Sequence, residues 1–514
     1  MLVKTFGSAV YGVEAITVTV EVNVNNQGQH YFIVGLPDNA VKESLQRVES
    51  AIKSNQFFMP RTKLVVNLAP ADIRKTGTAF DLPIAMGILG ATEQIEHSEK
   101  LGEYVIMGEL SLDGEIRPIK GALPIAVQAR KEKYKGLIVP LQNAREAAIV
   151  NNLDVYGVSH ISEVIGFFKN AESLQPVVVN TREEFAHAQS DFEIDFCDVK
   201  GQENIKRSLE IAAAGGHNAI LIGPPGAGKT MLAKRLPTIL PPLSLFEALE
   251  TTKIHSVAGK LPENATLISK RPYRAPHHTI SDVALVGGGG NPQPGEISLA
   301  HNGVLFLDEL PEFKRTVLEV MRQPMEERKV TISRAKVALD FPASFMLIAS
   351  MNPCPCGFFN HPEKECTCPP GAVQKYLNKI SGPLLDRIDL HVEVTPVAFN
   401  ELSSSRQYEK SEVIRERVIK ARSIQEERYK DSPGVYANAQ MSSKQLKEIC
   451  TISTVGQNLL KAAMEKLNLS ARAYDRILKV SRTIADLAGT AEIRPEHLAE
   501  AIQYRSLDRE GWGG

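Results

Sequence analysis

Residues 219–230 read A-I-L-I-G-P-P-G-A-G-K-T, and this stretch decides the fold of the central part of the chain. Four apolar residues in a row at Ala219–Ile222 predict a buried strand. The following loop, 223–230, has the spacing G-x-x-x-x-G-K-T of a phosphate-binding loop. A helical pattern comes next at 231–236, so the motif lies in the strand–loop–helix order that it requires.

The residues of this loop suit the triphosphate of a nucleotide. Glycines let backbone N–H groups converge on phosphate oxygens, and the helix N-terminus adds its positive end. Lys229 can reach the β- and γ-phosphates, and the hydroxyl of Thr230 can be a ligand of Mg²⁺. We therefore predict that ATP binds to Gly223, Pro224, Pro225, Gly226, Ala227, Gly228, Lys229 and Thr230.

A second apolar run ends in two acids. Val304–Leu307 is predicted to be another buried strand, and Asp308 and Glu309 follow it directly. Asp308 would hold Mg²⁺ through water, and Glu309 would polarise the attacking water. Acids at a strand end can be merely solubilising, but after a phosphate-binding loop they indicate a nucleotide hydrolase, because phosphoryl transfer depends on positioning and charge stabilisation.

Composition sets limits on the rest. A length of 514 residues predicts about three domains. The net charge of −1 gives no global basic field, so a nucleic-acid site would have to be a local patch or a pore. The apolar runs are too short to span a bilayer, and the N-terminus lacks the apolar core of a signal peptide. We expect a cytoplasmic protein with no membrane partner.

Residues 1–170 are predicted to form one α/β domain. Alternating or apolar runs predict strands at 15–24, 31–36, 63–68 and 136–140, a hairpin at 105–116, and helices at 38–53, 80–93 and 122–133. Asp38 is the expected N-cap of the first helix. Residues 171–198 turn polar and acidic and are predicted to be a linker.

The first region resembles the proteolytic domain of the Lon proteases and the related domain of the RadA repair ATPase. The resemblance lies in residues 77–85, 108–119 and 138–147. It implies an α/β fold of the ribosomal S5 domain 2-like type. Lon-type peptidases use a Ser–Lys dyad, but Ala79 and Leu123 stand at those two positions. Because covalent catalysis needs a nucleophile and a base, we expect a binding or assembly module and no peptidase activity.

The ATPase core is predicted at 199–395. Its paired histidines, His277 and His278, have no third ligand at a useful spacing, so we interpret them as loop residues at an interface. Residues 329–341 are predicted to be a hairpin with Arg334 and Lys336 near its tip. A basic tip facing the pore of a ring would contact DNA phosphates; the alternative is a solvated charged turn.

A strand at 345–350 is followed by Asn352, whose side chain can hydrogen-bond the γ-phosphate or the attacking water. A cysteine knuckle comes next at 354–368. Four thiolates from two tight turns fit a tetrahedral structural zinc site, although the C-x-C spacing is tighter than the usual C-x-x-C; a redox pair or free thiols are the alternatives. The predicted zinc ligands are Cys354, Cys356, Cys366 and Cys368.

Two arginines complete the candidate catalytic set of Glu309, Asn352, Arg387 and Arg472. Arg387 is the candidate arginine finger towards the nucleotide of a neighbouring subunit; the alternative is an ion pair with Asp386 or Asp389. Residues 396–514 are predicted to be a helical lid, in which Arg472 follows the cap residue Ser470 and would touch the γ-phosphate. Arg476, one turn further on, is the second candidate.

Several of these motifs together resemble the ComM/YifB family of magnesium-chelatase-like AAA+ ATPases. They are the phosphate-binding loop, V-L-F-L-D-E-L at 304–310, M-N-P-C-P-C-G at 351–357, G-P-L-L-D-R-I-D-L-H-V at 382–392 and L-S-A-R-A-Y-D-R-I-L at 469–478. With the Lon-like front domain, the resemblance covers nearly the whole chain. It implies a hexameric ring with ATP sites between subunits and, for ComM-type members, DNA branch migration during recombination and natural transformation.

Two functions from different classes remain open. The first is a ring motor that uses ATP to remodel single-stranded or branched DNA. The second is a protein-remodelling or chelatase-like ATPase that acts on a partner protein. Salt-sensitive DNA binding would favour the first, because phosphate contacts release counterions.

Overall fold

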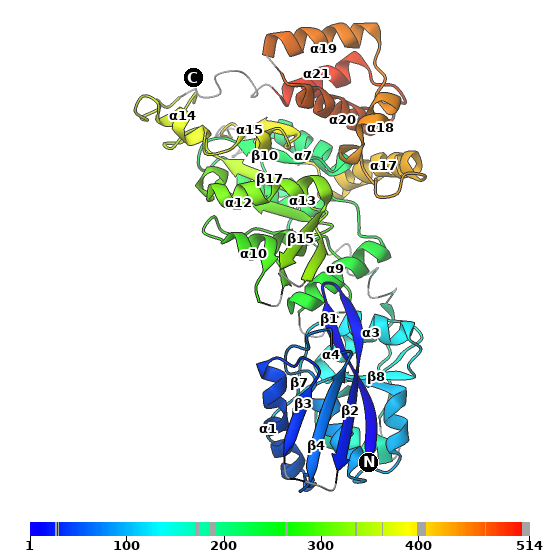
Figure 1. Ribbon diagram of the computed structural model, residues 1–514. Coiled ribbons are helices and arrows are strands. Elements are labelled where there is room, and N and C mark those ends of the chain that lie inside the picture. The colour runs from blue at the N-terminus through cyan, green and yellow to red at the C-terminus, as the bar shows by residue number, and fades with distance from the viewer. Residues whose placement is uncertain are drawn as a thin grey trace.

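The computed structural model describes residues 1–25, 28, 30–169, 174–181, 183, 185, 192–262, 266–290, 292–334, 337–361, 363–397, 408–467 and 469–505. These residues form an elongated molecule (Figure 1). The N-terminal sheet makes up one end, a second sheet lies in the middle, and the C-terminal helices cover the other end. The prediction of a multidomain α/β protein is confirmed in this sense.

The N-terminal sheet has seven strands in the order β3-β4-β2-β1-β5-β8-β9. The pairs β1–β2 and β2–β4 are antiparallel, and the other pairs are parallel. Along β2, Val18, Val20 and Val22 are buried and alternate with half-buried residues, as the sequence pattern predicts. The bounds are β1 (Leu2–Tyr11), β2 (Glu14–Asn25), β3 (Tyr31–Val34), β4 (Lys63–Ala69), β5 (Tyr104–Ile106), β8 (Gly136–Pro140) and β9 (Asp154–Val158).

Five helices and a small hairpin complete this part. They are α1 (Asn39–Ser54), α2 (Asp81–Ala91), α3 (Ala122–Lys131), α4 (Leu141–Ala147), α5 (Ile161–Lys169), β6 (Glu109–Leu110) and β7 (Ile116–Arg117). Asp38 caps α1, because its carboxylate accepts a hydrogen bond of 2.9 Å from the N–H of Val41. Every residue of α2 is buried, so this helix is the centre of the N-terminal core.

The middle sheet has five strands, and all of its recorded pairs are parallel. In spatial order they are β11 (Tyr273–Arg274), β14 (Val304–Leu307), β17 (Met346–Met351), β10 (Ala219–Ile222) and β18 (Leu390–Glu393). Their neighbours include α7 (Glu203–Gly215), α8 (Lys229–Arg235), α9 (Leu245–Ala258), α12 (Arg315–Val320) and α13 (Arg322–Glu327). The carboxyl ends of neighbouring parallel strands meet at one edge, where such sheets bind ligands.

The predicted hairpin before Asn352 is present as β15 (Lys329–Arg334) and β16 (Val337–Pro342). Its base packs into the core through Val330, Ile332 and Leu339. Lys336 lies outside the described residues, and of Arg334 only the backbone is described. The contact of this tip with DNA therefore stays a prediction.

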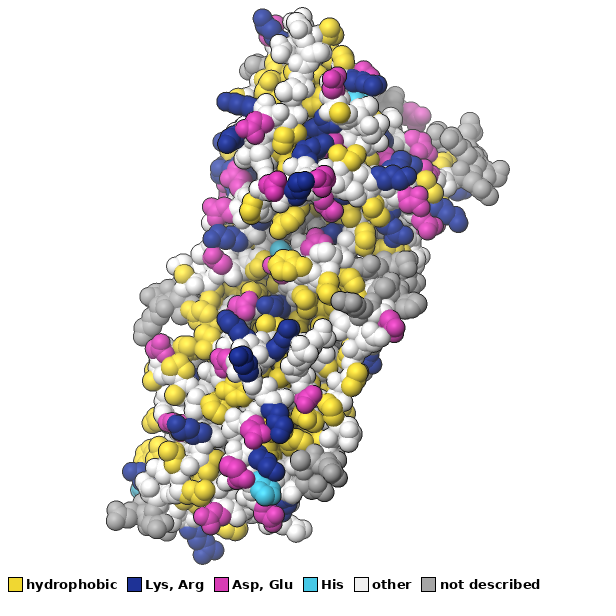
Figure 2. Space-filling model, turned by 90° about the vertical axis from the view of Figure 1, so that its right-hand side faces the viewer, with side chains coloured by type: hydrophobic (Ala, Val, Ile, Leu, Met, Phe, Trp, Pro, Cys, Tyr) yellow, Lys and Arg dark blue, Asp and Glu magenta, His cyan; other side chains and the backbone are white. Residues whose placement is uncertain are grey.

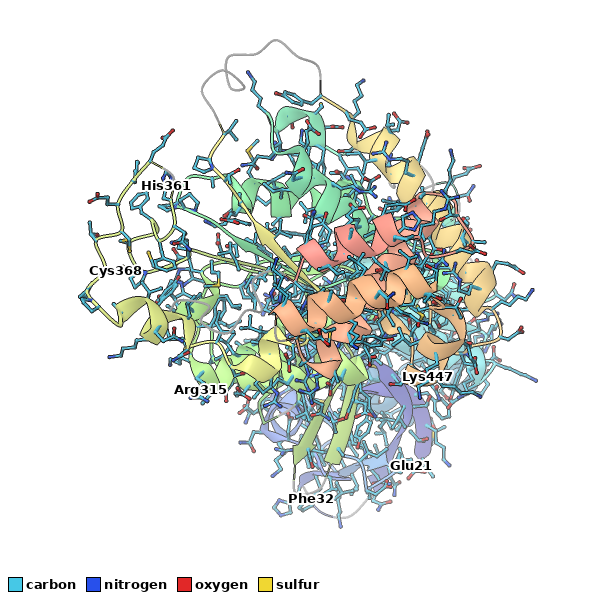
Figure 3. All side chains as sticks on the ribbon, turned by 90° about the horizontal axis from the view of Figure 1, so that it is seen from above. Glu21, Phe32, Arg315, His361, Cys368 and Lys447 are labelled. Atoms are coloured by element: carbon cyan, nitrogen blue, oxygen red, sulfur yellow. The ribbon has the colours of Figure 1, made fainter. Side chains whose placement is uncertain are left out.

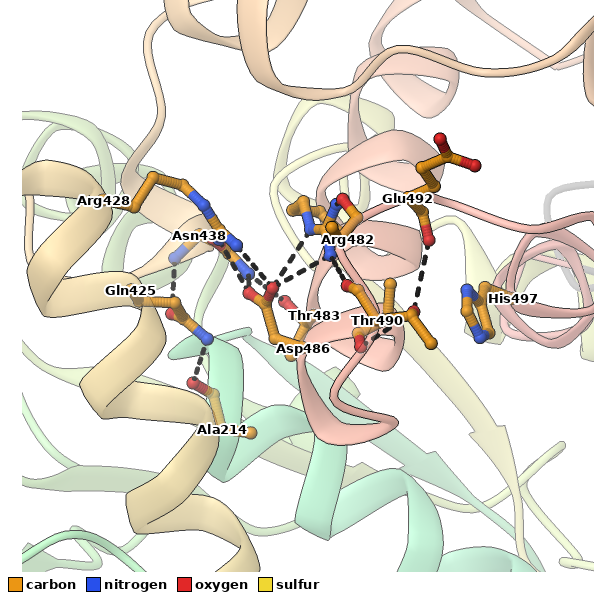
Figure 4. Close-up of polar contacts among 12 residues, drawn as sticks. Ala214, Gln425, Arg428, Asn438, Arg482, Thr483, Asp486, Thr490, Glu492 and His497 are labelled. Atoms are coloured by element: carbon orange, nitrogen blue, oxygen red, sulfur yellow. Dashed lines mark hydrogen bonds and ion pairs between the residues drawn. The ribbon is translucent and has the colours of Figure 1, made fainter.

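The C-terminal helices close over the sheet. They are α17 (Ser411–Tyr429), α18 (Ser443–Ile449), α19 (Thr454–Leu467), α20 (Ala471–Leu487) and α21 (Pro495–Gln503). Figure 4 shows a buried polar network in which Asp486 accepts hydrogen bonds from Arg428 and Asn438, both at 2.8 Å. Gln425 donates to the carbonyl of Ala214 at 3.1 Å, which fastens α17 to α7 beside the middle sheet.

The N-terminal and middle parts touch through α3, α4 and α9. The N–H of Gly121 donates to the carbonyl of Ser256 at 3.1 Å, and the Ser256 hydroxyl donates to the buried carboxyl of Glu146. Lys253 pairs with Glu14 at 3.1 Å. Within the described part of the chain, no helix has both the length and the apolar character needed to cross a bilayer.

Candidate nucleotide site and cysteine cluster

The phosphate-binding loop meets Asn352 at the edge of the middle sheet. The ammonium of Lys229 donates to the carbonyls of Gly223 at 2.6 Å and Pro224 at 2.9 Å, and to Oδ1 of Asn352 at 3.1 Å. Burial lowers the pKa of Lys229, and the carboxylates of Asp308 and Glu309 oppose this change. Lys229 follows β10 and Asn352 follows the neighbouring strand β17, so the parallel pairing brings them together.

The two predicted Mg²⁺ ligands also touch each other. The Thr230 hydroxyl donates to Oδ2 of Asp308 at 2.7 Å. The other carboxylate oxygen accepts a hydrogen bond from Ser350, a residue of β17 that was not predicted as part of the site. A hydroxyl and a carboxylate oxygen side by side are suitable ligands for Mg²⁺. The arrangement fits the cation that the phosphate-binding loop implies.

Glu309 stands apart from this group. Its backbone is left-handed, with φ of 55°, and its side chain is 58 % exposed. A carboxylate oxygen lies 3.5 Å from Nδ1 of His278, whose ring is tilted by 34° against that of His277 at 4.1 Å between centroids. The histidine pair, interpreted from sequence as interface residues, therefore lies beside the predicted water-polarising residue.

A further residue beside the loop was not predicted. The side-chain amide of Gln202 donates to the carbonyl of Ala227 at 2.7 Å and to that of Thr395 at 3.3 Å. Its backbone is left-handed, with φ of 59°, immediately before α7. The segment before α7 is thus held against the phosphate-binding loop. A single polar residue in a loop has no sequence pattern that would have indicated this contact.

The three candidate arginines form ion pairs with carboxylates outside the phosphate-binding loop. Arg387 is buried, with its guanidinium 2.6 Å from a carboxylate oxygen of Glu326; the sequence-based alternative, a pair with Asp386 or Asp389, is wrong. The reason is that the chain after α15 (Gly382–Leu385) turns this side chain towards α13. The remaining two lie on α20: Arg472 pairs with Asp386 at 3.2 Å and Arg476 with Asp389 at 3.0 Å.

The four predicted zinc ligands come together. Their sulfur atoms all lie within 4.8 Å of one another, and the sulfur of Cys366 is 3.7 Å from that of Cys354 and 3.5 Å from that of Cys356. Tetrahedral zinc with Zn–S bonds of about 2.3 Å needs sulfur atoms about 3.8 Å apart. The cluster is therefore close to the size that zinc requires.

The four sulfur atoms differ in how readily they ionise: the pKa of Cys356 is lowered, whereas burial and the neighbouring thiols raise the pKa values of Cys366 and Cys368. Burial opposes ionisation of Cys356, but hydrogen bonds from the backbone N–H groups of Phe358 and Thr367 lower its pKa to about 5. The N–H of Phe359 points at the sulfur of Cys354 at 3.3 Å. Backbone donors around thiolates stabilise the deprotonated form that a metal ion needs. Figure 3 shows Cys368 and His361 at the periphery of the molecule.

Comparison with known proteins shows which family this chain is similar to. Residues 20–143, 195–402 and 408–505 match three family models described as the subunit ChlI of magnesium chelatase, the last being its C-terminal part. The competence protein ComM of Haemophilus influenzae is 44% identical over 510 residues, 99% of this chain and 98% of that protein. YifB of Escherichia coli is 42% identical over 98% of this chain and 96% of its own length.

A third similarity is local. Lon protease 2 of Bacillus subtilis is 32% identical over 154 residues, which is 27% of this chain and 26% of that protein. At the two positions that the sequence analysis assigns to the peptidase dyad, Ala79 is half-buried and Leu123 is fully buried. Neither side chain has an ionisable group.

Proposed function

Because the chain belongs to the ComM/YifB family of magnesium-chelatase-like proteins, we propose that it is an AAA+ ring motor that hydrolyses ATP. The observation that carries the proposal is the convergence of Lys229, Thr230, Asp308 and Asn352 at the ends of three neighbouring parallel strands. The side chains form two contacting pairs, Lys229 with Asn352 and Thr230 with Asp308, and have the chemistry for phosphates, Mg²⁺ and water.

Each residue then has a role. The backbone of 223–230 and the ammonium of Lys229 bind the phosphates, in exchange for the carbonyl contacts that Lys229 now makes. Thr230 and Asp308 hold Mg²⁺, which neutralises charge on the phosphates. Asn352 orients water at the γ-phosphate, and Glu309 accepts its proton. Ser350 is a positioning residue, since its hydrogen bond fixes the Asp308 carboxylate.

We propose a homo-oligomeric, hexameric ring with ATP sites between subunits. Arg387, Arg472 and Arg476 each pair with a carboxylate of the same chain, away from the phosphate-binding loop. A site that lacks a local arginine is completed by one from the neighbouring subunit, as arginine fingers do. In this proposal Arg387 exchanges Glu326 for the neighbour's nucleotide, and Arg472 contacts the γ-phosphate when the lid closes.

The proposed substrate is single-stranded or branched DNA, which the motor remodels or branch-migrates in recombination and natural transformation. The support is the similarity to a competence protein over nearly the whole chain. On the face drawn in Figure 2, basic and acidic side chains are interspersed, in keeping with a net charge of −1. The DNA contact is therefore local, and Arg334 and Lys336 at the hairpin tip are the proposed contacts.

The alternative is a protein-remodelling or chelatase-like ATPase that acts on a partner protein. It is favoured by the matches to models of the magnesium-chelatase subunit over most of the chain. The two proposals share the ATP site and differ in what the ring moves.

We further propose the domain organisation expected from the sequence: a Lon-like domain at 1–170 without peptidase activity, a linker at 171–198, the ATPase core at 199–395 and a lid at 396–514. The similarity to a Lon protease over 154 residues supports the first of these. A structural zinc held by Cys354, Cys356, Cys366 and Cys368 is part of the core. Four protein ligands leave no open position, so zinc there would not act in catalysis.

ATP turnover tests the proposed substrate when it is measured without DNA, with single-stranded DNA and with a four-way junction. We expect stimulation by DNA that is lost in Arg334→Ala and Lys336→Ala. Lys329→Ala is the matched control, because Lys329 lies at the base of the same hairpin and pairs with Asp340 at 2.9 Å. Intact turnover with no stimulation by any DNA would contradict the DNA proposal and favour a partner protein.

A further inference from the structure

The cysteine cluster lies against the proposed ATP site. Asn352, which contacts Lys229 at 3.1 Å, is separated from Cys354 by a single proline. On the other side of Cys356, Gly357 packs on the phosphate-binding loop: a Cβ atom at Gly357 would lie 2.5 Å from Cδ of Pro225. Two points of the cysteine segment therefore touch the residues that would hold the phosphates.

The end of the same segment returns to its beginning. After the last cysteine the chain forms α14 (Ala372–Leu377), and Tyr376 on this helix is buried. Tyr376 belongs to the same apolar core as Met351 and Cys354. The segment thus begins at Asn352, which contacts Lys229, ends in the core beneath it, and is drawn together by four sulfur atoms that lie within 4.8 Å of one another.

One buried sulfur atom links metal binding by the cluster to the packing of the core around it. Cys354 has no exposed surface and belongs to the apolar core that also contains Leu307, Met351 and Tyr376. A metal ion that bridges four sulfurs closes this loop covalently, which removes much of the conformational freedom of the residues between them. Because Asn352 and Gly357 are within two residues of metal ligands, their positions follow those of the sulfur atoms.

From this juxtaposition we propose that metal held by the four cysteines sets the position of Pro225 and Asn352, and so the affinity of the phosphate-binding loop for nucleotide. The cysteine cluster then positions residues of the ATP site in addition to stabilising the fold. The inference rests on the proposed ATP site, and its residues act through Pro225 and Asn352 without touching the nucleotide.

A pair of glycine variants separates positioning from folding. Gly357→Ala keeps all four sulfur atoms but pushes on Pro225, whereas Gly371→Ala, in the same segment, meets no atom within 4 Å. Both glycines are left-handed, with φ of 85° and 77°, so the backbone strain of the two variants is matched. We expect Gly357→Ala to weaken binding of a fluorescent ATP analogue about tenfold or more at unchanged zinc content, and Gly371→Ala to leave both unchanged.

The second experiment removes zinc from the full chain and then adds it back. Chelation of zinc from the wild-type chain should weaken nucleotide binding, and added zinc should restore it. Cys356→Ser should behave like the chelated protein, whereas Cys197→Ser, at a cysteine outside the cluster, should bind like wild type.

Three results would overturn the proposal: a wild-type chain that contains no zinc, an unchanged affinity after zinc removal, or a normal affinity in Gly357→Ala. Failure of the proposed ATPase itself is distinguishable, because the zinc-loaded wild-type chain would then not bind nucleotide at all. If Cys356→Ser does not fold, chelation and Gly357→Ala still decide between the outcomes.

Discussion

At the scale of single residues, Lys229 connects the phosphate-binding loop to the rest of the site. Its ammonium bonds to two loop carbonyls and to the Asn352 side chain, so in the present structure it occupies the region that phosphates would enter. A buried cation of this kind gains most from an anionic ligand, because burial strengthens electrostatic interactions.

We predict that Lys229→Ala abolishes measurable nucleotide binding. The reason is the loss of the side-chain cation that contacts the carbonyls of Gly223 and Pro224. Lys234→Ala is the matched control, since Lys234 is an exposed lysine on the same helix α8. Equilibrium binding of a fluorescent ATP analogue measures both variants. Wild-type affinity in Lys229→Ala would show that nucleotide does not bind at this loop.

The sequence brought neighbours together correctly where a motif ties a residue to a strand end, while the roles of these residues in ATP hydrolysis stay predictions. Thr230 contacts Asp308 and Lys229 contacts Asn352, because these residues follow strands whose apolar runs are plain in the sequence. Ser350 and Gln202 escaped prediction, since a serine inside a strand and a glutamine in a loop have no characteristic spacing. The partner of Arg387 depends on how α13 and α15 pack, which no local pattern records.

At the scale of elements, burial on both faces distinguishes α2 from the other helices of the N-terminal part. All of its residues are buried, and Gly87 lets it approach β2. A Cβ atom there would lie 2.6 Å from Cγ2 of Val22. In α5, by contrast, Gly166 has no atom within 4 Å of the corresponding position. The same substitution should therefore have opposite effects in the two helices.

We predict that Gly87→Ala destabilises the protein by about 1–3 kcal/mol through overpacking. Gly166→Ala should stabilise it by up to about 1 kcal/mol, because alanine is the better helix former. Urea denaturation followed by circular dichroism measures both. Equal effects of the two variants would mean that α2 does not pack on β2 as described.

Strands with apolar runs were predicted, and β1 was not. Its burial is irregular, because the polar residues Thr5 and Ser8 are buried within it. The hydroxyl of Thr5 donates to the carbonyl of Pro83 in α2 at 2.9 Å, so a tertiary contact makes up for the polar residue. The sequence pattern alone cannot show such a partner, whereas β10 and β14 are wholly apolar and were predicted with their observed bounds.

At the scale of the whole molecule, the proposed ring would complete each ATP site with an arginine from a neighbouring subunit. The candidate arginines are engaged in ion pairs on α13, α20 and the segment before β18. Arg387 is the most informative of them for the ring proposal. Its partner Glu326 belongs to α13 and not to the phosphate-binding loop. The ring proposal requires this pair to open.

We predict that Arg387→Ala retains nucleotide binding but lowers ATP turnover about a thousandfold, as loss of an arginine finger does. Glu326→Gln is the control, because it removes the partner and leaves the arginine. It should hydrolyse ATP at least as fast as wild type. Steady-state turnover at saturating ATP measures both. If the two variants lost activity equally, the ion pair would be the functional unit and Arg387 would not act as a finger.

The central claim is hydrolysis of ATP at the edge of the middle sheet, and the most direct test is Glu309→Gln. Nucleotide affinity and single-turnover hydrolysis are measured on the wild-type chain and on this variant, with Mg²⁺ present. We expect unchanged affinity and hydrolysis slower by about a hundredfold or more, because the group that accepts the proton of water is gone. Normal turnover by Glu309→Gln would contradict the assignment of this site.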